Sequence, residues 1–241
     1  MNRQKDYIQG SLESSKFSAQ KPLYYEGLEK IKLMGYSFED LVQYFPCFTG
    51  HQTLTRFLTL YEIYKSTLGL SGHIAEVGIY KAASTIFFSK LVKIFESNSF
   101  TQVHGFDWFQ GNKPSEEEEF IVSGADVESY DRVCELVNAQ DLSNITKIHK
   151  VDVTTELDSF FKENSHLQFK IVFLDAGMYE VVKTCLPIFW ERLVKGGCLI
   201  LDQYNFDIAP GETKAINEFF NHSVEIKTFP WGWMPTAYII K

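Results

Sequence analysis

The sequence predicts an α/β fold: a doubly wound, mainly parallel sheet of seven strands, with one antiparallel strand in a C-terminal hairpin and a helical appendage at the N-terminus. Three observations support this fold class. After Gly72, short apolar runs alternate with longer stretches of helical periodicity, as in repeated βα units. The last two apolar runs follow one another without room for a helix, so one strand runs antiparallel. Between Tyr24 and Leu70, apolar residues recur at helical spacing.

Taken in order, the elements form one domain. Residues 1–22 are polar and aperiodic, so residues 1–70 are expected to be a tail and a helical cap, with residues 71–241 as the core. The predicted strands are His73–Val77, Val103–Phe106, Ile145–Val151, Lys170–Leu174, Gly197–Leu201, Val224–Phe229 and Ala237–Lys241. The predicted helices of the core are Ser84–Phe95, Ser129–Asn138, Glu180–Leu193 and Thr213–Asn221.

Composition excludes several classes of protein. A net charge of −8 argues against a nucleic-acid partner, because a polyphosphate requires a basic surface. No apolar run reaches the roughly 18–20 residues of a membrane span, and residues 1–6 lack the apolar core of a signal peptide, so a cytoplasmic location is expected. The cysteines and histidines show no zinc-binding spacing. The acidic run Glu116–Glu119 is interpreted as a solvated loop or a first helical turn.

The segment Gly72–Ser84 is the first candidate for ligand binding. Its strand ends on Glu76, turns through Gly78 and enters a helix through small residues. In an open α/β sheet, ligands bind beyond the carboxyl ends of the strands near the switch point of the topology. The alternative is that Gly78 and Ala82 only form a tight βα connection. The three-glycine pattern of dinucleotide binders is absent, which disfavours a nicotinamide enzyme.

Acidic residues end five successive predicted strands. They are Glu76, Asp107, Asp152, Asp175 and Asp202. A carboxylate at Asp107 can accept hydrogen bonds from the vicinal hydroxyls of a ribose, and Trp108 or Phe109 can pack on an adenine face. Each acidic residue alone could be a cap, but such a series along one edge of the sheet favours a ligand site.

The chain from about Phe45 to its end resembles the macrocin O-methyltransferase family, class I S-adenosylmethionine-dependent methyltransferases that modify sugar hydroxyls of macrolides and related metabolites. The matching pieces are Glu76–Lys81, Gly105–Gly111, Leu174–Glu180, Lys195–Gly197, Leu201–Tyr204 and Pro210–Ala215. The resemblance implies S-adenosyl-L-methionine as cofactor, with Glu76, Gly78 and Asp107 at its site. With their neighbours along the edge, the expected cofactor residues are Glu76, Gly78, Tyr80, Ser84, Asp107, Trp108, Asp152, Val153 and Asp175.

The resemblance also implies a divalent metal, usually magnesium, at Asp175 and Asp202. The family usually carries Asp-x-Asp where this chain has Asp175-Ala176-Gly177, and Asp-Asp where it has Asp202-Gln203. Mg²⁺ tolerates several water ligands, so Asp175, Asp202 and the amide oxygen of Gln203 are the expected ligands if the ion binds. Metal dependence is left open.

The expected reaction is attack of a substrate hydroxyl on the sulfonium methyl group. Asp175 and Asp202 are the candidate catalytic residues, and Asp175 is the first candidate base where no metal binds. The expected acceptor is a small, glycosidic molecule. Two rivals remain: a degenerate fold that binds cofactor or partner without catalysis, favoured by Gly177 and Gln203, and a metal-dependent hydroxylase, which would need two histidines and a carboxylate.

Two aromatic regions have open roles. The tryptophans of the Trp231–Pro235 loop would suit sugar stacking, although a packed hairpin needs no ligand. The N-terminal aromatic residues could cover the acceptor or form a homo-oligomer interface, with core packing as the simpler interpretation. These aromatic residues are Tyr24, Tyr25, Tyr44, Phe45 and Phe48.

Overall fold

The computed structural model describes residues 21–116, 118, 121–207 and 209–241, so most of the predicted tail lies outside the described residues. The helices are α1 (Lys21–Leu33), α2 (Phe38–Gln43), α3 (Phe45–Phe48), α4 (His51–Ser66), α5 (Ala83–Phe95), α6 (Tyr130–Ala139), α7 (Leu157–Glu163), α8 (Tyr179–Arg192) and α9 (Pro210–Phe220). The strands are β1 (His73–Val77), β2 (Val103–Asp107), β3 (Thr146–Lys150), β4 (Phe169–Leu174), β5 (Leu193–Leu201) and β6 (Ala237–Ile240). Helix α7 is not among the predicted core helices.

The strands form one sheet in the order β3-β2-β1-β4-β5-β6. All neighbours are parallel except β5 and β6, which confirms the doubly wound α/β fold with one antiparallel strand. Because β1 lies between β2 and β4, the topology reverses there and opens a crevice at the carboxyl ends of these strands.

The predicted strand Val224–Phe229 is wrong, and the described sheet has six strands instead of seven. Only Lys227 of this segment pairs, in an isolated bridge to Tyr238. Pro230 follows directly and has no N–H to extend the ladder. A turn also closes there, because the N–H of Gly232 donates to the carbonyl of Phe229 at 3.0 Å. The alternating pattern therefore ends before it can form a strand.

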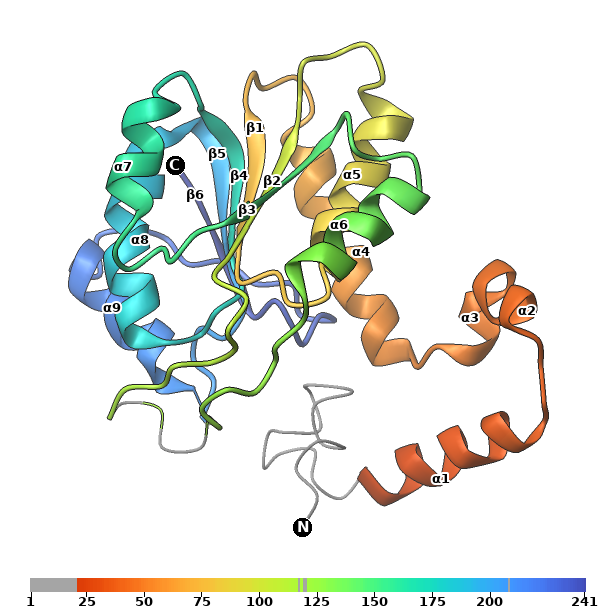
Figure 1. Ribbon diagram of the computed structural model, residues 1–241. Coiled ribbons are helices and arrows are strands. Elements are labelled where there is room, and N and C mark those ends of the chain that lie inside the picture. Colours follow the sequence, from red (N-terminus) through yellow and green to blue (C-terminus); the bar gives the residue numbers. More distant parts are fainter. Residues whose placement is uncertain (1–20, 117, 119–120, 208) are drawn as a thin grey trace.

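Helices cover both faces of the sheet, with α4, α5 and α6 on one side and α7, α8 and α9 on the other (Figure 1). Every residue of β4 is buried, as expected for a central parallel strand covered on both faces. Helix α4 belongs to this core, because its Leu60, Ile63 and Tyr64 pack with buried residues of β1 and α5. The segment predicted as a cap therefore contributes one helix to the body of the domain.

Helices α1, α2 and α3 extend away from the sheet (Figure 1). None of the five aromatic residues noted in this region is buried, and Tyr44 and Phe45 are each 51% exposed. Core packing does not account for these side chains, which leaves the cap and the interface as their alternatives. Among the described residues, no helix has both the length and the apolar character to cross a membrane.

Candidate cofactor site and active site

The loop after β1 has an unusual backbone. Gly78 has a φ of +84°, and a Cβ there would lie 2.6 Å from the carbonyl oxygen of Asp175, so only glycine fits. Tyr80 and Ala82 also have positive φ values, 46° and 60°, which side chains disfavour. Such strain persists only where neighbouring groups hold it, and it concentrates at functional sites.

Asp107, at the end of β2, holds this loop. Its Oδ2 accepts the N–H groups of Ile79 and Tyr80 at 3.0 and 3.1 Å, and its Oδ1 accepts that of Phe109 at 2.7 Å. A carboxylate offers about four acceptor positions, so one remains for a ribose hydroxyl instead of the two expected. Asp152 behaves similarly, since its Oδ1 accepts the N–H and the hydroxyl of Thr154. Capping and ligand binding are therefore compatible roles.

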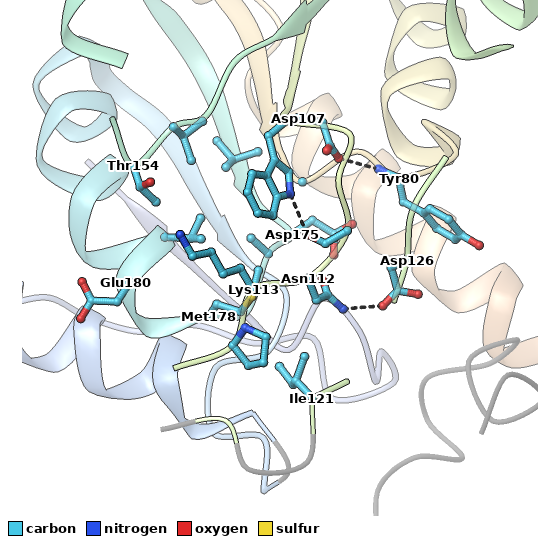
Figure 2. A pocket seen from close by; sticks show the side chains of 18 of the residues that line it. Tyr80, Asp107, Asn112, Lys113, Ile121, Asp126, Thr154, Asp175, Met178 and Glu180 are labelled. Atoms are coloured by element: carbon cyan, nitrogen blue, oxygen red, sulfur yellow. Dashed lines mark hydrogen bonds between the residues drawn. The ribbon is translucent and has the colours of Figure 1, made fainter. Parts of the chain in front are cut away.

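A cavity of about 610 Å³ lies beside this loop (Figure 2). Trp108 forms part of its wall and is fixed there, because its Nε1 donates to the carbonyl of Gly111 at 2.6 Å. Of the nine expected cofactor residues, seven line the same cavity: Gly78, Tyr80, Asp107, Trp108, Asp152, Val153 and Asp175.

Glu76 and Ser84 are not among the lining residues of this cavity. Val77 lines it, and neighbouring side chains of a strand point to opposite faces, so Glu76 turns away toward α5. Its carboxylate is 1% exposed and accepts a short hydrogen bond from Thr85. Ser84 is 3% exposed and lies 3.4 Å from a nitrogen of Arg56. Both expected cofactor residues thus belong to a second cluster, which shares Asp175 with the cavity.

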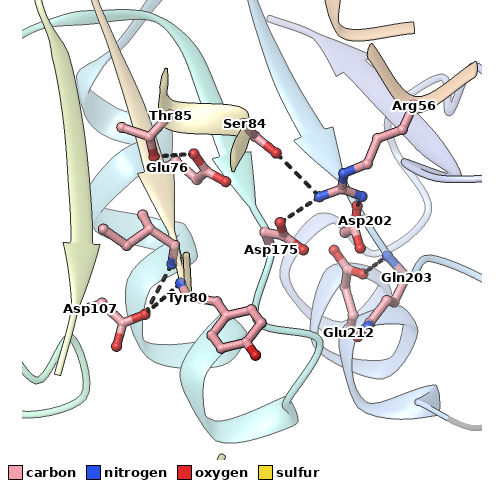
Figure 3. Close-up of polar contacts among 11 residues, drawn as sticks. Arg56, Glu76, Tyr80, Ser84, Thr85, Asp107, Asp175, Asp202, Gln203 and Glu212 are labelled. Carbon is pink, nitrogen blue, oxygen red and sulfur yellow. Dashed lines mark hydrogen bonds and ion pairs between the residues drawn. The ribbon is translucent and has the colours of Figure 1, made fainter. Parts of the chain in front are cut away.

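Arg56 of α4 is the centre of that cluster (Figure 3). Its Nη2 lies 2.5 Å from Oδ2 of Asp175 and its Nη1 lies 2.5 Å from Oδ1 of Asp202. The guanidinium also lies 5.3 Å from the centre of the Phe173 ring. Asp175 and Asp202 follow neighbouring strands whose last residues are paired, so one planar guanidinium spans both carboxylates.

The cluster contains more carboxyl groups than cations. Burial raises the pKa of Glu76 to about 8. Burial also raises the pKa of Asp175, with repulsion from Asp202 and Glu76 adding to it and attraction to Arg56 opposing it. The pKa of the Glu212 carboxyl is raised as well, by burial and by repulsion from Asp202. Burial alone would lower the pKa of Arg56, but attraction by Asp175 and Asp202 outweighs it and raises this pKa.

The donors expected for magnesium do not fit a divalent ion in this arrangement. Asp175 and Asp202 are each bonded to a nitrogen of Arg56. The amide oxygen of Gln203 lies instead against Gly177, where any Cβ would collide with it. Within residues 21–116, 118, 121–207 and 209–241, no group of three or more His, Cys, Asp or Glu residues is placed to hold a metal ion.

The sequence interpretation missed Arg56, although one signal was present. Arg56 lies three and four residues before Thr59 and Leu60, and seven before Ile63, which places it on the buried stripe of α4. A charged residue on such a stripe requires a buried partner.

The acidic run was also misread in part. Glu118 is 1% exposed instead of solvated, because it accepts the N–H groups of Ser115 and of Tyr179 at the start of α8. Glu116 is exposed, as expected, and residues 117 and 119 lie outside the described part of the chain.

A doubly wound sheet with an acidic carboxyl edge and a cavity at its switch point is typical of α/β proteins that bind a small ligand at this edge. The chain belongs to the family described as methyltransferase domain, whose sequence model matches residues 75–204. It is therefore a methyltransferase that uses S-adenosylmethionine. Arg56 lies before the matched segment.

Solved structures share the fold. A structure of the calicheamicin methyltransferase CalS11 has a TM-score of 0.81 at 21% identity, covering 91% of this chain and 93% of its own. An apo structure of CalS11, described as a TDP-rhamnose 3'-O-methyltransferase, has a TM-score of 0.76 at 22% identity, covering 91% and 94%. The O-methyltransferase NovP has a TM-score of 0.61 at 17% identity, covering 78% and 79%. No curated protein matches the chain significantly in sequence.

Proposed function

We propose that this protein transfers a methyl group from S-adenosylmethionine to a hydroxyl of a sugar or a sugar-containing small molecule. The observation that carries the proposal is the position of Asp175, which lines the same cavity as Gly78, Asp107 and Asp152. The O-methyltransferase descriptions of CalS11 and NovP support the choice of a hydroxyl, and so does the resemblance to the macrocin O-methyltransferase family.

The charge of the cavity wall suits this cofactor. Its described lining residues include five carboxyl side chains, Asp107, Asp126, Asp152, Asp175 and Glu180, and one ammonium, Lys113. The sulfonium of S-adenosylmethionine is a cation, so an acidic wall favours its binding over that of the neutral product. Release of the demethylated cofactor is favoured for the same reason.

One end of the cavity is apolar and suits the acceptor. Ile121, Phe206, Ala209 and Met234 line it, and Trp233 packs against the same cluster. The ring C–H groups of a sugar, or an apolar substituent on it, can lie on such a surface while the hydroxyl faces Asp175. The loop Trp231–Pro235 would then support the acceptor through Met234 more than through direct stacking of Trp231, which is 47% exposed.

The chemistry proceeds by in-line displacement. The acceptor oxygen forms a bond to the methyl carbon as the carbon–sulfur bond breaks, and the electron pair of that bond stays on sulfur. The hydroxyl proton passes to the carboxylate of Asp175, the acidic group at the junction of the cofactor and acceptor regions. The protein contributes mainly by alignment of the two reactants, which is worth up to roughly 7–11 kcal/mol in well-oriented systems.

Calorimetric titration with S-adenosylmethionine, followed by a labelled methyl-transfer assay on nucleotide-linked sugars and neutral glycosides, tests the proposal. We expect micromolar cofactor binding and transfer to at least one acceptor hydroxyl. No cofactor binding would refute the proposal, and binding without transfer across the panel would favour the degenerate alternative. The hydroxylase alternative gains no support from the described wall, which contains no histidine.

A further inference from the structure

We propose that Arg56 is the permanent cation of this active site, and that it positions Asp175 and Asp202 so that methyl transfer proceeds without a divalent metal. This inference rests on the proposed function for its catalytic part. The geometry that carries it is the fork of Arg56, with one nitrogen at 2.5 Å from each aspartate.

The surroundings of Arg56 are shaped for a guanidinium. Its Nη2 also reaches the hydroxyl of Ser84 at 3.4 Å, and the Phe173 ring lies 5.3 Å from its central carbon. A planar, weakly hydrated cation can use an aromatic face in this way. A small hydrated ion such as Mg²⁺ requires near-octahedral oxygen ligands instead. These contacts therefore suit a guanidinium better than a hydrated metal ion.

Gly177 and Gln203, which lie close in sequence to the two aspartates, agree with this assignment. Gly177 offers no side-chain ligand, its φ of +63° disfavours other residues, and a Cβ there would require the Gln203 amide to move. In Figure 3, the Gln203 side chain points away from the Arg56–Asp202 pair. The amide oxygen expected among the ligands thus faces a different part of the site, and the pair of aspartates is left to one cation.

A tethered cation has a further advantage over a dissolved one. Arg56 is carried by α4, which is anchored in the core by Leu60, Ile63 and Tyr64, so it is present at the site whenever the domain is folded. A dissolved ion must displace this guanidinium to reach Asp175 and Asp202, and that competition favours the intramolecular partner.

Thermal unfolding with and without millimolar MgCl₂ tests the assignment independently of catalysis. We expect no shift in the Tm of the full-length wild-type protein after dialysis against EDTA, and a Mg²⁺-dependent rise in the Tm of Arg56→Ala, whose aspartates have lost their cation. Guanidinium chloride at low millimolar concentration should raise the Tm of Arg56→Ala in the same way. Arg132→Ala is the matched control, because Arg132 is 75% exposed and pairs with Glu128 on the surface.

Methyl transfer supplies the second measurement. The wild-type rate should change less than about twofold on addition of EDTA or MgCl₂, while Arg56→Ala should lose most of its kcat and regain part of it with guanidinium. A wild-type Tm that rises with Mg²⁺, or a wild-type rate abolished by EDTA and restored by Mg²⁺, would overturn the proposal. These wild-type experiments decide the question even if Arg56→Ala does not fold. Absence of S-adenosylmethionine binding would refute the proposed function, whereas the Mg²⁺ titration still reports on Arg56.

Discussion

A fully buried and a partly buried cation lie at opposite ends of β4, and their surroundings differ. Lys170, at its beginning, is fully buried and places its Nζ 2.7 Å from both oxygens of Glu96. Glu96 also accepts the hydroxyls of Tyr64 and Thr101 at 2.6 and 2.9 Å. Arg56, beyond the other end of β4, contacts two aspartates and lies near further buried carboxyl groups.

The difference is that between a balanced ion pair and a cluster with an excess of carboxyl groups. Burial alone would raise the pKa of Glu96, but hydrogen bonds from Lys170 and Tyr64 outweigh it and lower this pKa, so its charge is matched one to one. At the Arg56 end, burial raises the pKa of Glu76 and of Asp175, and repulsion from Asp202 adds to the rise against the attraction of Arg56. An unmatched cluster costs stability, and such clusters are retained where they contribute to a site.

The largest expected effect concerns the matched pair. Lys170→Met leaves Glu96, whose side chain is 12% exposed, without its cation, and we expect a loss of about 3–5 kcal/mol in the free energy of unfolding. Urea unfolding measures it, and Lys93→Met is the control, because Lys93 pairs with Asp141, which is 92% exposed. The affinity of the folded fraction for S-adenosylmethionine should not change. A change in that affinity would break the distinction between the two ends of β4.

A smaller effect is expected at the cofactor edge, and it should appear in binding. Asp107→Ala removes the acceptor of the Ile79, Tyr80 and Phe109 N–H groups and the proposed acceptor of a ribose hydroxyl, so we expect calorimetry to show S-adenosylmethionine affinity weakened by roughly 10–100-fold. Asp107→Asn keeps one acceptor oxygen, so its affinity for S-adenosylmethionine should lie between those of the wild type and Asp107→Ala. The exposed Asp141→Ala is the control, and unchanged affinity in Asp107→Ala would remove this residue from the cofactor site.

The smallest expected effect is a change in the pH dependence of unfolding. Because the folded pKa of Glu76 is raised to about 8, its contribution to stability is complete below the unfolded pKa of about 4.5 and is lost as the pH rises through 8. Glu76→Gln should therefore flatten the pH dependence of unfolding, with a gain in stability at pH 8 and little change at pH 4.

Glu96→Gln should change the stability of the protein in the opposite direction. The pKa of Glu96 is lowered in the folded protein, so its removal should lose stability at neutral pH. Urea unfolding at a series of pH values measures both variants. If both variants changed stability in the same direction at neutral pH, the distinction between the balanced Lys170–Glu96 pair and the unbalanced cluster around Arg56 would be contradicted.

Seven of the nine expected cofactor residues line one cavity, because the sequence signals that predict them are local. Gly78, Asp107 and Asp152 each follow an apolar run directly, so strand and ligand residue appear together in the sequence. The cluster around Arg56 joins residues that are 119 and 146 positions apart, and no local pattern reports such a pairing. The same limit explains Glu76, whose position after β1 was visible but whose orientation depends on the pleat and on Thr85 of α5.

The missing strand has a comparable explanation. Residues 224–229 carry the right composition, but pairing is decided by Pro230 and the turn at Gly232, which end the hairpin after a single bridge. Composition alone cannot report how many ladder bonds a segment makes.

The contact between Gly177 and Gln203 has a consequence for evolution and for protein engineering. A Cβ at position 177 would meet the amide of Gln203, the far end of a flexible side chain, which must then move aside or be shortened. The two positions are therefore coupled, and a substitution at 177 should be better tolerated beside a shorter residue at 203. A designer who introduces a carboxylate at 177 should consider both positions together.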